Sequence, residues 1–249
     1  DKSGRMTKLS KQLAGLKVAE AREKAVENLG DNVEKIDEYT HSVPVCERCK
    51  TTVEPLISEE WFVKMEALAQ KALNKIKEVN FAPKNYLKIL SDWIRNLHDW
   101  SISRSLWWGH RIPVWYCQKC NLNQVVGKNE GMVVSLEKPK EDCPKCNGKE
   151  WIQDEKVLDT WFSSGMWPLA TLGWPDETKE LKKYFPWDFE TSAGEIKFLW
   201  IARMIMLSVY FTDKIPFKNQ FFHGMLRDLQ GRKFSKSLGN GIDPNELRA

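Results

Sequence analysis

Two lysines and two serines lie close together on a short segment between Gly231 and Gly239. Their side chains are those of Lys233, Ser235, Lys236 and Ser237. Ammonium and hydroxyl groups on a loop can follow negative charge as it moves, which suits a triphosphate undergoing reaction. A solvated basic turn is the ordinary alternative for such a cluster. The residue types predict that this segment handles a nucleotide.

All six cysteines fall in Cys-x-x-Cys pairs, which random placement would not produce. Cys117/Cys120 and Cys143/Cys146 have nearly the separation found in a four-cysteine zinc ribbon, where two hairpin tips surround one ion. We expect this zinc to be structural, because four thiolates leave no open position for a substrate. Disulfides or a redox dithiol are the alternatives, but there is no secretory context for the first, and the two matched pairs argue against the second.

The third pair, Cys46 and Cys49, has no partner pair left in the chain, so we predict a zinc half-site there. His41 lies just before it and could supply a third ligand. A lone histidine is, however, more often an ordinary surface or core residue. The sequence therefore leaves the partner of this pair open.

Composition limits the class of protein. The chain has 249 residues, 42% of them hydrophobic, which is enough for a core of domain size. Its 38 basic and 34 acidic residues give a net charge of +4, which neither demands nor excludes a nucleic acid partner. The most apolar run, residues 198–211, is too short for a membrane span and contains Arg203, so it predicts a buried helix. The chain starts without methionine, and we expect a fragment of a longer protein.

Hydrophobic periodicity predicts three helices before the second cysteine pair. They cover residues 14–29, residues 58–79 and residues 83–100. In the second and third, apolar residues recur at steps of three and four, so each is expected to bury one face. A short strand is expected at residues 156–158, ahead of Trp161.

The order Lys233-Phe234-Ser235-Lys236-Ser237 resembles the KMSKS signature of class I aminoacyl-tRNA synthetases. Phe234 stands where methionine is usual, but both side chains are apolar, so the chemistry is not put in doubt. The resemblance implies a loop that closes over ATP, usually with Mg²⁺ on the phosphates. Lys236 would stabilise the pentavalent phosphate, Lys233 would hold the outer phosphates, and the serines would be supporting donors.

Further blocks resemble the valyl-type enzymes of that family. They are residues 102–116, 157–168, 198–206 and 222–228. Trp108-Gly109-His110 is not the HIGH signature, because the first histidine is missing and Pro113 follows too soon for a helix. The block around it instead matches the valyl-type sequence, which isoleucyl and leucyl enzymes replace with variants. The resemblance covers essentially the whole chain.

The resemblance implies an α/β fold, namely the carboxyl half of a Rossmann-type class I synthetase catalytic domain with an inserted zinc ribbon. Residues 1–55 would be the returning segment of an editing insertion with the lone cysteine pair. Residues 56–116 would be catalytic-domain helices and a connective segment. Residues 117–150 would form the ribbon, and residues 151–249 the carboxyl half of the Rossmann-type domain with the lysine loop.

The resemblance also implies binding residues. Trp161, Ile196 and Trp200 would wall the amino-acid pocket, and Ile196 and Trp200 are expected on one helical face because they are one turn apart. The ATP-binding residues would be a strand-like stretch together with the two lysines: His223, Gly224, Met225, Leu226, Lys233 and Lys236.

Two acidic residues have implied secondary roles. Glu195 stands where the family has aspartate, and it could hold a ribose or an amino group. Asp228 is expected to be a partner at the hinge of the lysine loop rather than a general acid or base.

The implied function is ATP-dependent activation of valine and its transfer to tRNA(Val) in the cytoplasm, without a membrane partner. The parent protein would also edit threonine, which an apolar pocket hardly rejects. The missing amino-terminal half is an implied partner, and we expect the chain alone to be inactive because HIGH is absent. The alternatives are an isoleucyl- or leucyl-type synthetase and a non-catalytic zinc-ribbon module of synthetase ancestry.

Overall fold

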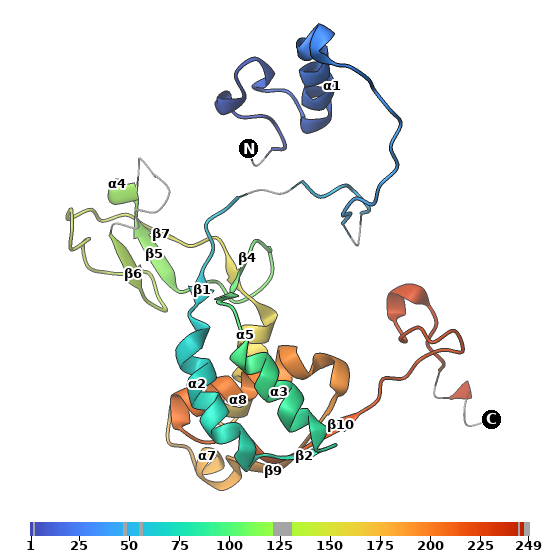
Figure 1. Ribbon diagram of the computed structural model, residues 1–249. Helices are drawn as coiled ribbons and strands as arrows, with labels where there is room; N and C mark the ends of the chain where they lie inside the picture. Colours follow the sequence, from blue (N-terminus) through green and yellow to red (C-terminus); the bar gives the residue numbers. More distant parts are fainter. Residues whose placement is uncertain (2, 47–48, 55–56, 122–130, 244, 247–249) are drawn as a thin grey trace. The chain divides into compact units, whose positions relative to one another are not determined.

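The computed structural model describes residues 1, 3–46, 49–54, 57–121, 131–243 and 245–246 (Figure 1). The chain divides into two compact units, residues 1–59 and residues 60–249. In the described residues, no helix is long and apolar enough to cross a membrane.

The described residues of the first unit form one α-helix, α1 (Val18–Leu29), between the 3-10 turns η1 (Lys8–Leu13) and η2 (Gly30–Asn32). Gly30 has φ 48° and ends α1, so the expected end of this helix is confirmed. The helix starts later than residue 14 because Gly15 has φ 85°, which an α-helix cannot include.

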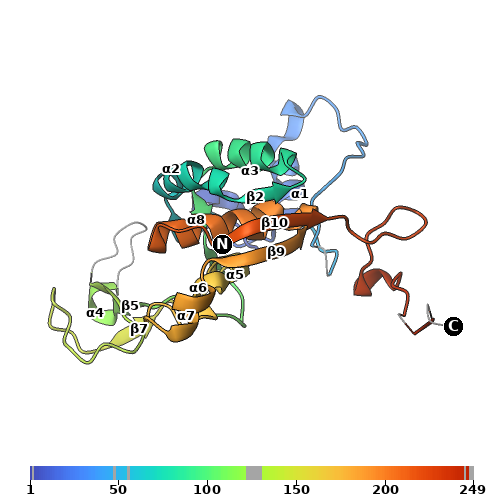
Figure 2. The same cartoon turned by 90° about the horizontal axis from the view of Figure 1, so that it is seen from below.

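A three-stranded parallel sheet forms the centre of the second unit (Figure 2). Its order is β2 (Asn80–Ala82), β10 (Phe217–His223) and β9 (Trp187–Ala193). The central strand places Asn219 opposite Asn80 on one side and Phe189 on the other. Because all three strands run in the same direction, their carboxyl ends lie at one edge, where ligands bind in folds of this kind.

Helices α2 (Met65–Lys75), α3 (Asn85–Arg95) and α8 (Ala202–Thr212) pack with this sheet around one core. Helix α8 follows a π-helical turn, η5 (Lys197–Ile201), and lies against α2, α5 (Thr160–Gly165) and α6 (Trp167–Ala170). Most residues of α8 are buried, which confirms the buried helix expected at residues 198–211.

The predicted start of the helix at residues 58–60 is wrong. Phe62–Val63 instead form strand β1, which pairs with β3 (Trp100–Ser101), so Trp100 lies outside α3. Helix α2 begins only at Met65, whose backbone N–H donates to Asp99 Oδ1 at 3.1 Å. Strand pairing between residues far apart in sequence here overrides the local periodicity.

The residues around the second cysteine pair belong to a separate antiparallel sheet. Its order is β6 (Met132–Val134), β5 (Val114–Cys117) and β7 (Trp151–Gln153). The short helix α4 (Gln118–Asn121) follows β5 directly. This three-stranded ribbon agrees with the inserted ribbon predicted from the cysteine spacing.

Strand β8 (Val157–Leu158) confirms the strand expected at residues 156–158. It pairs antiparallel with β4 (Ser103–Arg104) and does not belong to the parallel sheet. Trp161 therefore follows a strand that lies outside the parallel sheet. The remaining helix, α7 (Lys179–Tyr184), precedes β9.

Candidate active site and metal centre

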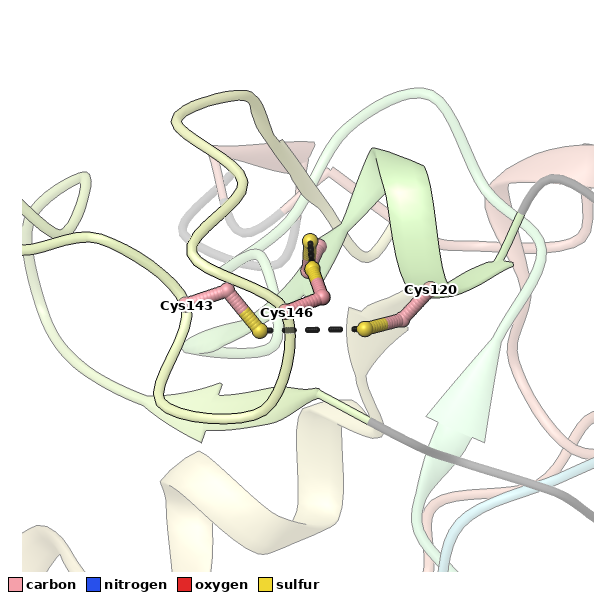
Figure 3. Close-up of side chains that lie close together, drawn as sticks. Cys120, Cys143 and Cys146 are labelled. Carbon is pink, nitrogen blue, oxygen red and sulfur yellow. Dashed lines mark hydrogen bonds between the residues drawn. The ribbon is translucent and has the colours of Figure 1, made fainter.

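Four cysteines converge at one end of the ribbon. Their Sγ atoms all lie within 4.8 Å of one another, and they form a group that could hold a metal ion. Cys117 Sγ lies 3.4 Å from Cys146 Sγ, and Cys120 Sγ lies 3.7 Å from Cys143 Sγ (Figure 3). Four sulfurs at about 2.3 Å from a tetrahedral zinc ion would be about 3.8 Å apart, so the cluster fits a structural zinc ion closely.

The backbone of the ribbon brings these sulfurs together. Cys117 N–H donates to the Gly131 carbonyl, and Cys143 N–H donates to the Gly148 carbonyl, both at 2.9 Å. A side chain at either glycine would crowd the cluster, because a Cβ would lie 3.0 Å from Cys120 Sγ at Gly131 and 3.0 Å from Cys117 Sγ at Gly148. The glycines thus allow the chain to pass directly over the sulfurs.

The thiols of the cluster titrate unequally. Burial raises the pKa of Cys117, and the neighbouring Cys146 thiol is the largest cause that raises the pKa of Cys120 to about 12. Burial opposes ionisation of Cys143, but backbone N–H groups of Lys145 and Cys146 lower its pKa to about 7. Negative charge therefore accumulates at this site only with difficulty, and a bound cation would relieve the repulsion.

The lone pair lies in the first unit on a similar turn. Cys46 N–H donates to the Thr51 carbonyl at 2.8 Å, and the Cys49 thiol donates to Thr51 Oγ1 at 3.3 Å. His41 stacks on Tyr39. Among the described residues, Cys46 and Cys49 join no group of three metal-ligating side chains, so the structure does not supply His41 as a third ligand.

A cavity of about 370 Å³ opens at the carboxyl ends of the parallel strands. Strand β9 contributes the residues after Ala193, β10 contributes its last residues, and β2 contributes the proline that follows it. The lining residues are Pro83, Tyr86, Gly194, Glu195, Lys197, Phe222, His223 and Gly224. Of the residues expected to bind ATP, His223 and Gly224 therefore lie at this cavity.

Strand β10 ends at His223, so the expectation of a strand at residues 224–226 is wrong. Gly224, Met225 and Leu226 follow the strand, and the side chain of Leu226 is 75% exposed. His223 Nδ1 lies 2.9 Å from the Gly224 carbonyl oxygen, which directs the ring back along the chain. Gly224 is also exposed, and nothing lies within 4 Å of the position of a Cβ at Gly224.

Two lining residues at the end of β9 were not selected from the sequence. A Cβ at Gly194 would lie 2.4 Å from the Tyr86 hydroxyl, so a larger residue here would require the Tyr86 side chain to shift. Lys197 Nζ donates to the Gly194 carbonyl at 2.8 Å and lies 4.3 Å from the centre of the Phe198 ring. Lys197 and Glu195 thus bring charges of opposite sign to the lining of the cavity.

The three expected amino-acid pocket residues, Trp161, Ile196 and Trp200, are half-buried. Trp161 belongs to α5, which packs against the π-turn η5 that carries Trp200. Trp200 Nε1 donates to the Ser164 carbonyl of α5 at 3.2 Å. Ile196 ends the 3-10 turn η4 (Gly194–Ile196), so the expectation of one regular helical face for Ile196 and Trp200 is wrong.

A buried carboxylate fixes the start of α5. Asp159 Oδ2 accepts Trp100 Nε1–H at 3.1 Å and pairs with the Arg104 guanidinium at 3.1 Å. The Arg203 guanidinium stacks over the Trp100 ring at 4.1 Å, and its partial burial lowers the pKa of Arg203. These contacts hold the wall that carries Trp161 against α8.

The lysine loop follows β10 and ends with the 3-10 turn η6 (Lys236–Leu238). Gly231 has φ 76° and Gly239 has φ 60°, both in the left-handed region that favours glycine. Lys233 and Lys236 are exposed, and Ser235 is half-buried. The side chain of Ser237 lies outside the described part of the structure.

The loop has a cavity of its own, of about 330 Å³, lined by Phe234, Ser235, Lys236, Gly239 and Gly241. It shares no lining residue with the cavity at the strand ends. One ion pair connects the two regions, since Arg227 Nη2 lies 3.2 Å from Glu195 Oε1. Of the residues expected to bind ATP, the structure therefore groups His223 with Gly224, and places Lys236 at the second cavity.

The segment Trp108-Gly109-His110 opens no helix, as expected from the rejection of HIGH. Strand β5 starts shortly after it, and Trp108 is 89% exposed. His110 Nδ1 lies 2.9 Å from Ser163 Oγ. In the described residues, this histidine therefore supports α5 and does not reach either cavity.

Known proteins resemble the chain over nearly its whole length. A family model described as tRNA synthetases class I (I, L, M and V) matches residues 6–248. The valine-tRNA ligase of Petrotoga mobilis is 47% identical over 251 residues, covering 99% of this chain and 28% of that protein. The valine-tRNA ligase of Thermotoga maritima is 45% identical, with the same coverage. The chain thus spans about 28% of the length of these curated relatives.

The fold has a counterpart among solved structures. Mycobacterium tuberculosis methionyl-tRNA synthetase in complex with methionyl-adenylate is similar with a TM-score of 0.52 and 20% sequence identity. The similarity covers 82% of this chain and 33% of that chain. At this level of identity, the similarity concerns the fold alone.

Proposed function

The chain belongs to the class I tRNA synthetases of the isoleucine, leucine, methionine and valine group, and from this membership we propose that it is part of a valine-tRNA ligase. The observation that carries the proposal is the 45–47% identity to two valine-tRNA ligases over 99% of the chain. This similarity favours valine over the isoleucyl- or leucyl-type alternative.

The proposed reaction joins valine to AMP and then to tRNA(Val). In the first step, a carboxylate oxygen of valine bonds to the α-phosphorus of ATP, and the bond from that phosphorus to the β-phosphate bridging oxygen breaks. Pyrophosphate leaves with the electron pair. No general acid or base is required, so catalysis depends on positioning and on stabilising charge.

The strand-end cavity is the proposed site for the nucleoside, with His223, Gly224, Met225 and Leu226 as binding residues. The volume of about 370 Å³ and the open space beside Gly224 support this assignment. Lys233 and Lys236, with Ser235 and Ser237, would hold the phosphates, usually with Mg²⁺ bound to them. Because the two cavities share no lining residue, the lysine loop would move toward the strand ends when one ATP contacts both.

Trp161, Ile196 and Trp200 are the proposed walls of the valine pocket. Their partial burial and the Trp200–Ser164 hydrogen bond support a rigid apolar wall. Glu195, at the rim of the nucleoside cavity, would accept an ammonium or ribose hydroxyl group. Its ion pair with Arg227 must then open or be shared.

Zinc is the proposed metal of the ribbon, and it would be held by Cys117, Cys120, Cys143 and Cys146. It would stabilise the fold of the ribbon, since the thiolates leave no position for a substrate. Cys46 and Cys49 would form half of a second site in residues 1–55, the proposed returning segment of an editing insertion. Residues 56–116 are proposed as catalytic-domain helices and a connective segment, residues 117–150 as the ribbon, and residues 151–249 as the carboxyl half of the Rossmann-type domain with the lysine loop.

The proposed partners are valine, ATP, tRNA(Val) and the amino-terminal half of the same protein, in the cytoplasm. The non-catalytic module is the competing proposal, and activity of the complete protein separates the two. Because the chain spans about 28% of its relatives, we expect the isolated chain to make no valyl-adenylate.

Replacement of Lys236 by alanine in the complete protein tests the proposal. We expect the kcat of valine-dependent exchange of pyrophosphate into ATP to fall at least about a hundredfold, because the lysine acts on charge in the transition state. The KM for valine should hardly change. Lys214→Ala, which removes an exposed lysine beyond α8, is the control. An unchanged rate in Lys236→Ala would remove this lysine from the mechanism.

A further inference from the structure

The carboxylate of Asp228 accepts four hydrogen bonds at the base of the lysine loop. Oδ1 accepts the backbone N–H of Gln230 at 3.1 Å and that of Arg232 at 2.8 Å. Oδ2 accepts Arg232 Nε–H at 2.7 Å and the Asn240 side-chain amide at 2.9 Å. The side chain is only 10% exposed, although the surrounding loop is largely exposed. Asn240 is the largest cause that lowers the pKa of Asp228, so the carboxylate is charged at neutral pH.

Asn240 joins this carboxylate to the loop backbone. Its Nδ2 donates to Asp228 Oδ2 at 2.9 Å and to the Lys233 carbonyl at 3.2 Å. Its Oδ1 accepts the Ser235 backbone N–H at 2.9 Å. The partners determine the orientation of the amide, since a carboxylate and a carbonyl only accept and a backbone N–H only donates.

These bonds hold the chain on both sides of Phe234. The Phe234 N–H itself donates to the Leu226 carbonyl at 3.3 Å, and Arg227 bridges Lys233 in an antiparallel pair. Three successive residues of the loop are thereby tied down through their backbone. In the described residues, no carboxylate pairs with Lys233 or Lys236, so the ammonium groups stay available while the backbone is held.

We infer that Asn240 is a positioning residue that sets the loop backbone from which Lys233 and Lys236 reach the phosphates. The inference rests on the proposed function, because it gives the two lysines the phosphate-binding role. Only an amide meets the requirement at this position, since the side chain must donate to Asp228 and to Lys233 and accept from Ser235. Aspartate lacks the donor and would place a second negative charge against Asp228.

Amide hydrogen exchange measured on the complete protein tests the contact itself. In Asn240→Asp and Asn240→Ala, we expect the Ser235 amide to exchange roughly tenfold faster, because its hydrogen bond is lost or weakened. Asn245→Ala is the matched control, since this asparagine lies on the same segment but bonds to Asp243. The core should be unaffected, because its buried cluster ends at Phe222, and the thermal unfolding midpoint checks this.

A double variant that exchanges the carboxylate and the amide between residues 228 and 240 tests their pairing. In Asp228→Asn with Asn240→Asp, the amide at residue 228 would donate to the new carboxylate at residue 240, which can still accept the Ser235 N–H. We expect slower exchange at Ser235 in the double variant than in Asn240→Asp alone. Equal exchange in these two variants would show that Asn240 does not act through Asp228.

Measurements of activity distinguish failure of this inference from failure of the proposed function. We expect kcat of valine-dependent pyrophosphate exchange to fall roughly tenfold in Asn240→Asp, with the KM for valine unchanged and part of the rate restored in the double variant. Full activity in Asn240→Asp would overturn this inference alone. Unchanged exchange at Ser235 would do the same. Absence of the reaction in the wild-type complete protein would overturn the proposed function, and this inference with it.

Discussion

The described residues of the first cysteine turn (Cys46 and residues 49–51) share two backbone hydrogen bonds with the turn at residues 143–148, but the two turns have different surroundings. In each turn, the first cysteine N–H donates to the carbonyl of the residue five positions later, at Thr51 or Gly148. In each, the N–H of the residue after the second cysteine donates back to the first cysteine carbonyl, and that residue has a positive φ, 59° at Lys50 and 53° at Asn147. The sequence pattern thus builds the turn locally, whether or not other ligands are present.

The two turns differ in what faces them. At the ribbon, Cys117 Sγ would lie 3.0 Å from a Cβ at Gly148, so that glycine leaves room for the opposite pair. The other turn carries Thr51 at the same position, and its hydroxyl bonds to Cys49. A Cys-x-x-Cys turn is therefore only a pair of ligands, and a metal centre also requires a facing pair and space for its approach.

The largest effect is expected from Cys143→Ser in this chain. We expect one tightly bound zinc ion per wild-type chain and an affinity at least about a hundredfold lower in the variant, if roughly 12 kcal/mol of binding is shared by four ligands. Metal analysis after dialysis against a chelator measures this. Full retention of zinc would mean that the four cysteines named here are not its ligands.

An exchange of residues between the turns should have a smaller effect. Gly148→Thr introduces the Thr51 side chain at the ribbon, where it would crowd Cys117 Sγ. We expect this overpacking to cost about 1.4 kcal/mol of binding free energy, which corresponds to roughly tenfold weaker zinc binding. Competition with a chromophoric chelator gives the affinity, and Gly241→Thr, at a glycine with nothing within 4 Å of its Cβ position, is the control. Equal affinities would contradict the close approach.

The thiol of Cys49 provides a pH-dependent test. A hydrogen bond that the Thr51 hydroxyl donates to the thiolate is the largest cause that lowers the pKa of Cys49 to about 7. Its thiolate is therefore present above about pH 7 and is lost as the pH falls through that value. In the zinc-loaded chain, Thr51→Val should raise this pKa and slow alkylation of Cys49 at pH 7 about fivefold. Mass spectrometry of alkylated peptides reports the rate, and equal rates at pH 7 would exclude this role of Thr51.

The smallest effect is expected from Cys46→Ser. Because this cysteine joins no group of three ligands in the described residues, zinc bound tightly by the isolated chain should change less than about twofold. The same metal analysis applies. A loss as large as that in Cys143→Ser would show that the two turns share one ion.

Local patterns predicted the cluster of four cysteines far better than the strand-end cavity. The spacing of the cysteines sufficed because each turn forms within a few residues and the ribbon closes over a short segment. The cavity depends on β2, β9 and β10, which meet only in the folded chain, and Gly194 gave no sign that it faces Tyr86. Asp228 and Gly231 have the spacing of an Asp-x-x-Gly turn, so the sequence indicates a turn at the base of the loop. The hydrogen bonds of Asn240 have no such local pattern and could not be predicted from the sequence.

The distance along the chain between the strands of the parallel sheet also determines whether this sheet or the ribbon forms first during synthesis. The side-chain hydrogen bond between Asn80 and Asn219 joins residues 139 apart, whereas the paired sulfurs of the ribbon are 23 and 29 residues apart. Contacts between near residues form sooner, because less chain entropy is lost in closing the loop. On the ribosome, the ribbon can therefore bring its four sulfurs together while β10 has not yet emerged, and the sheet that lines the strand-end cavity must wait until β10 has been made.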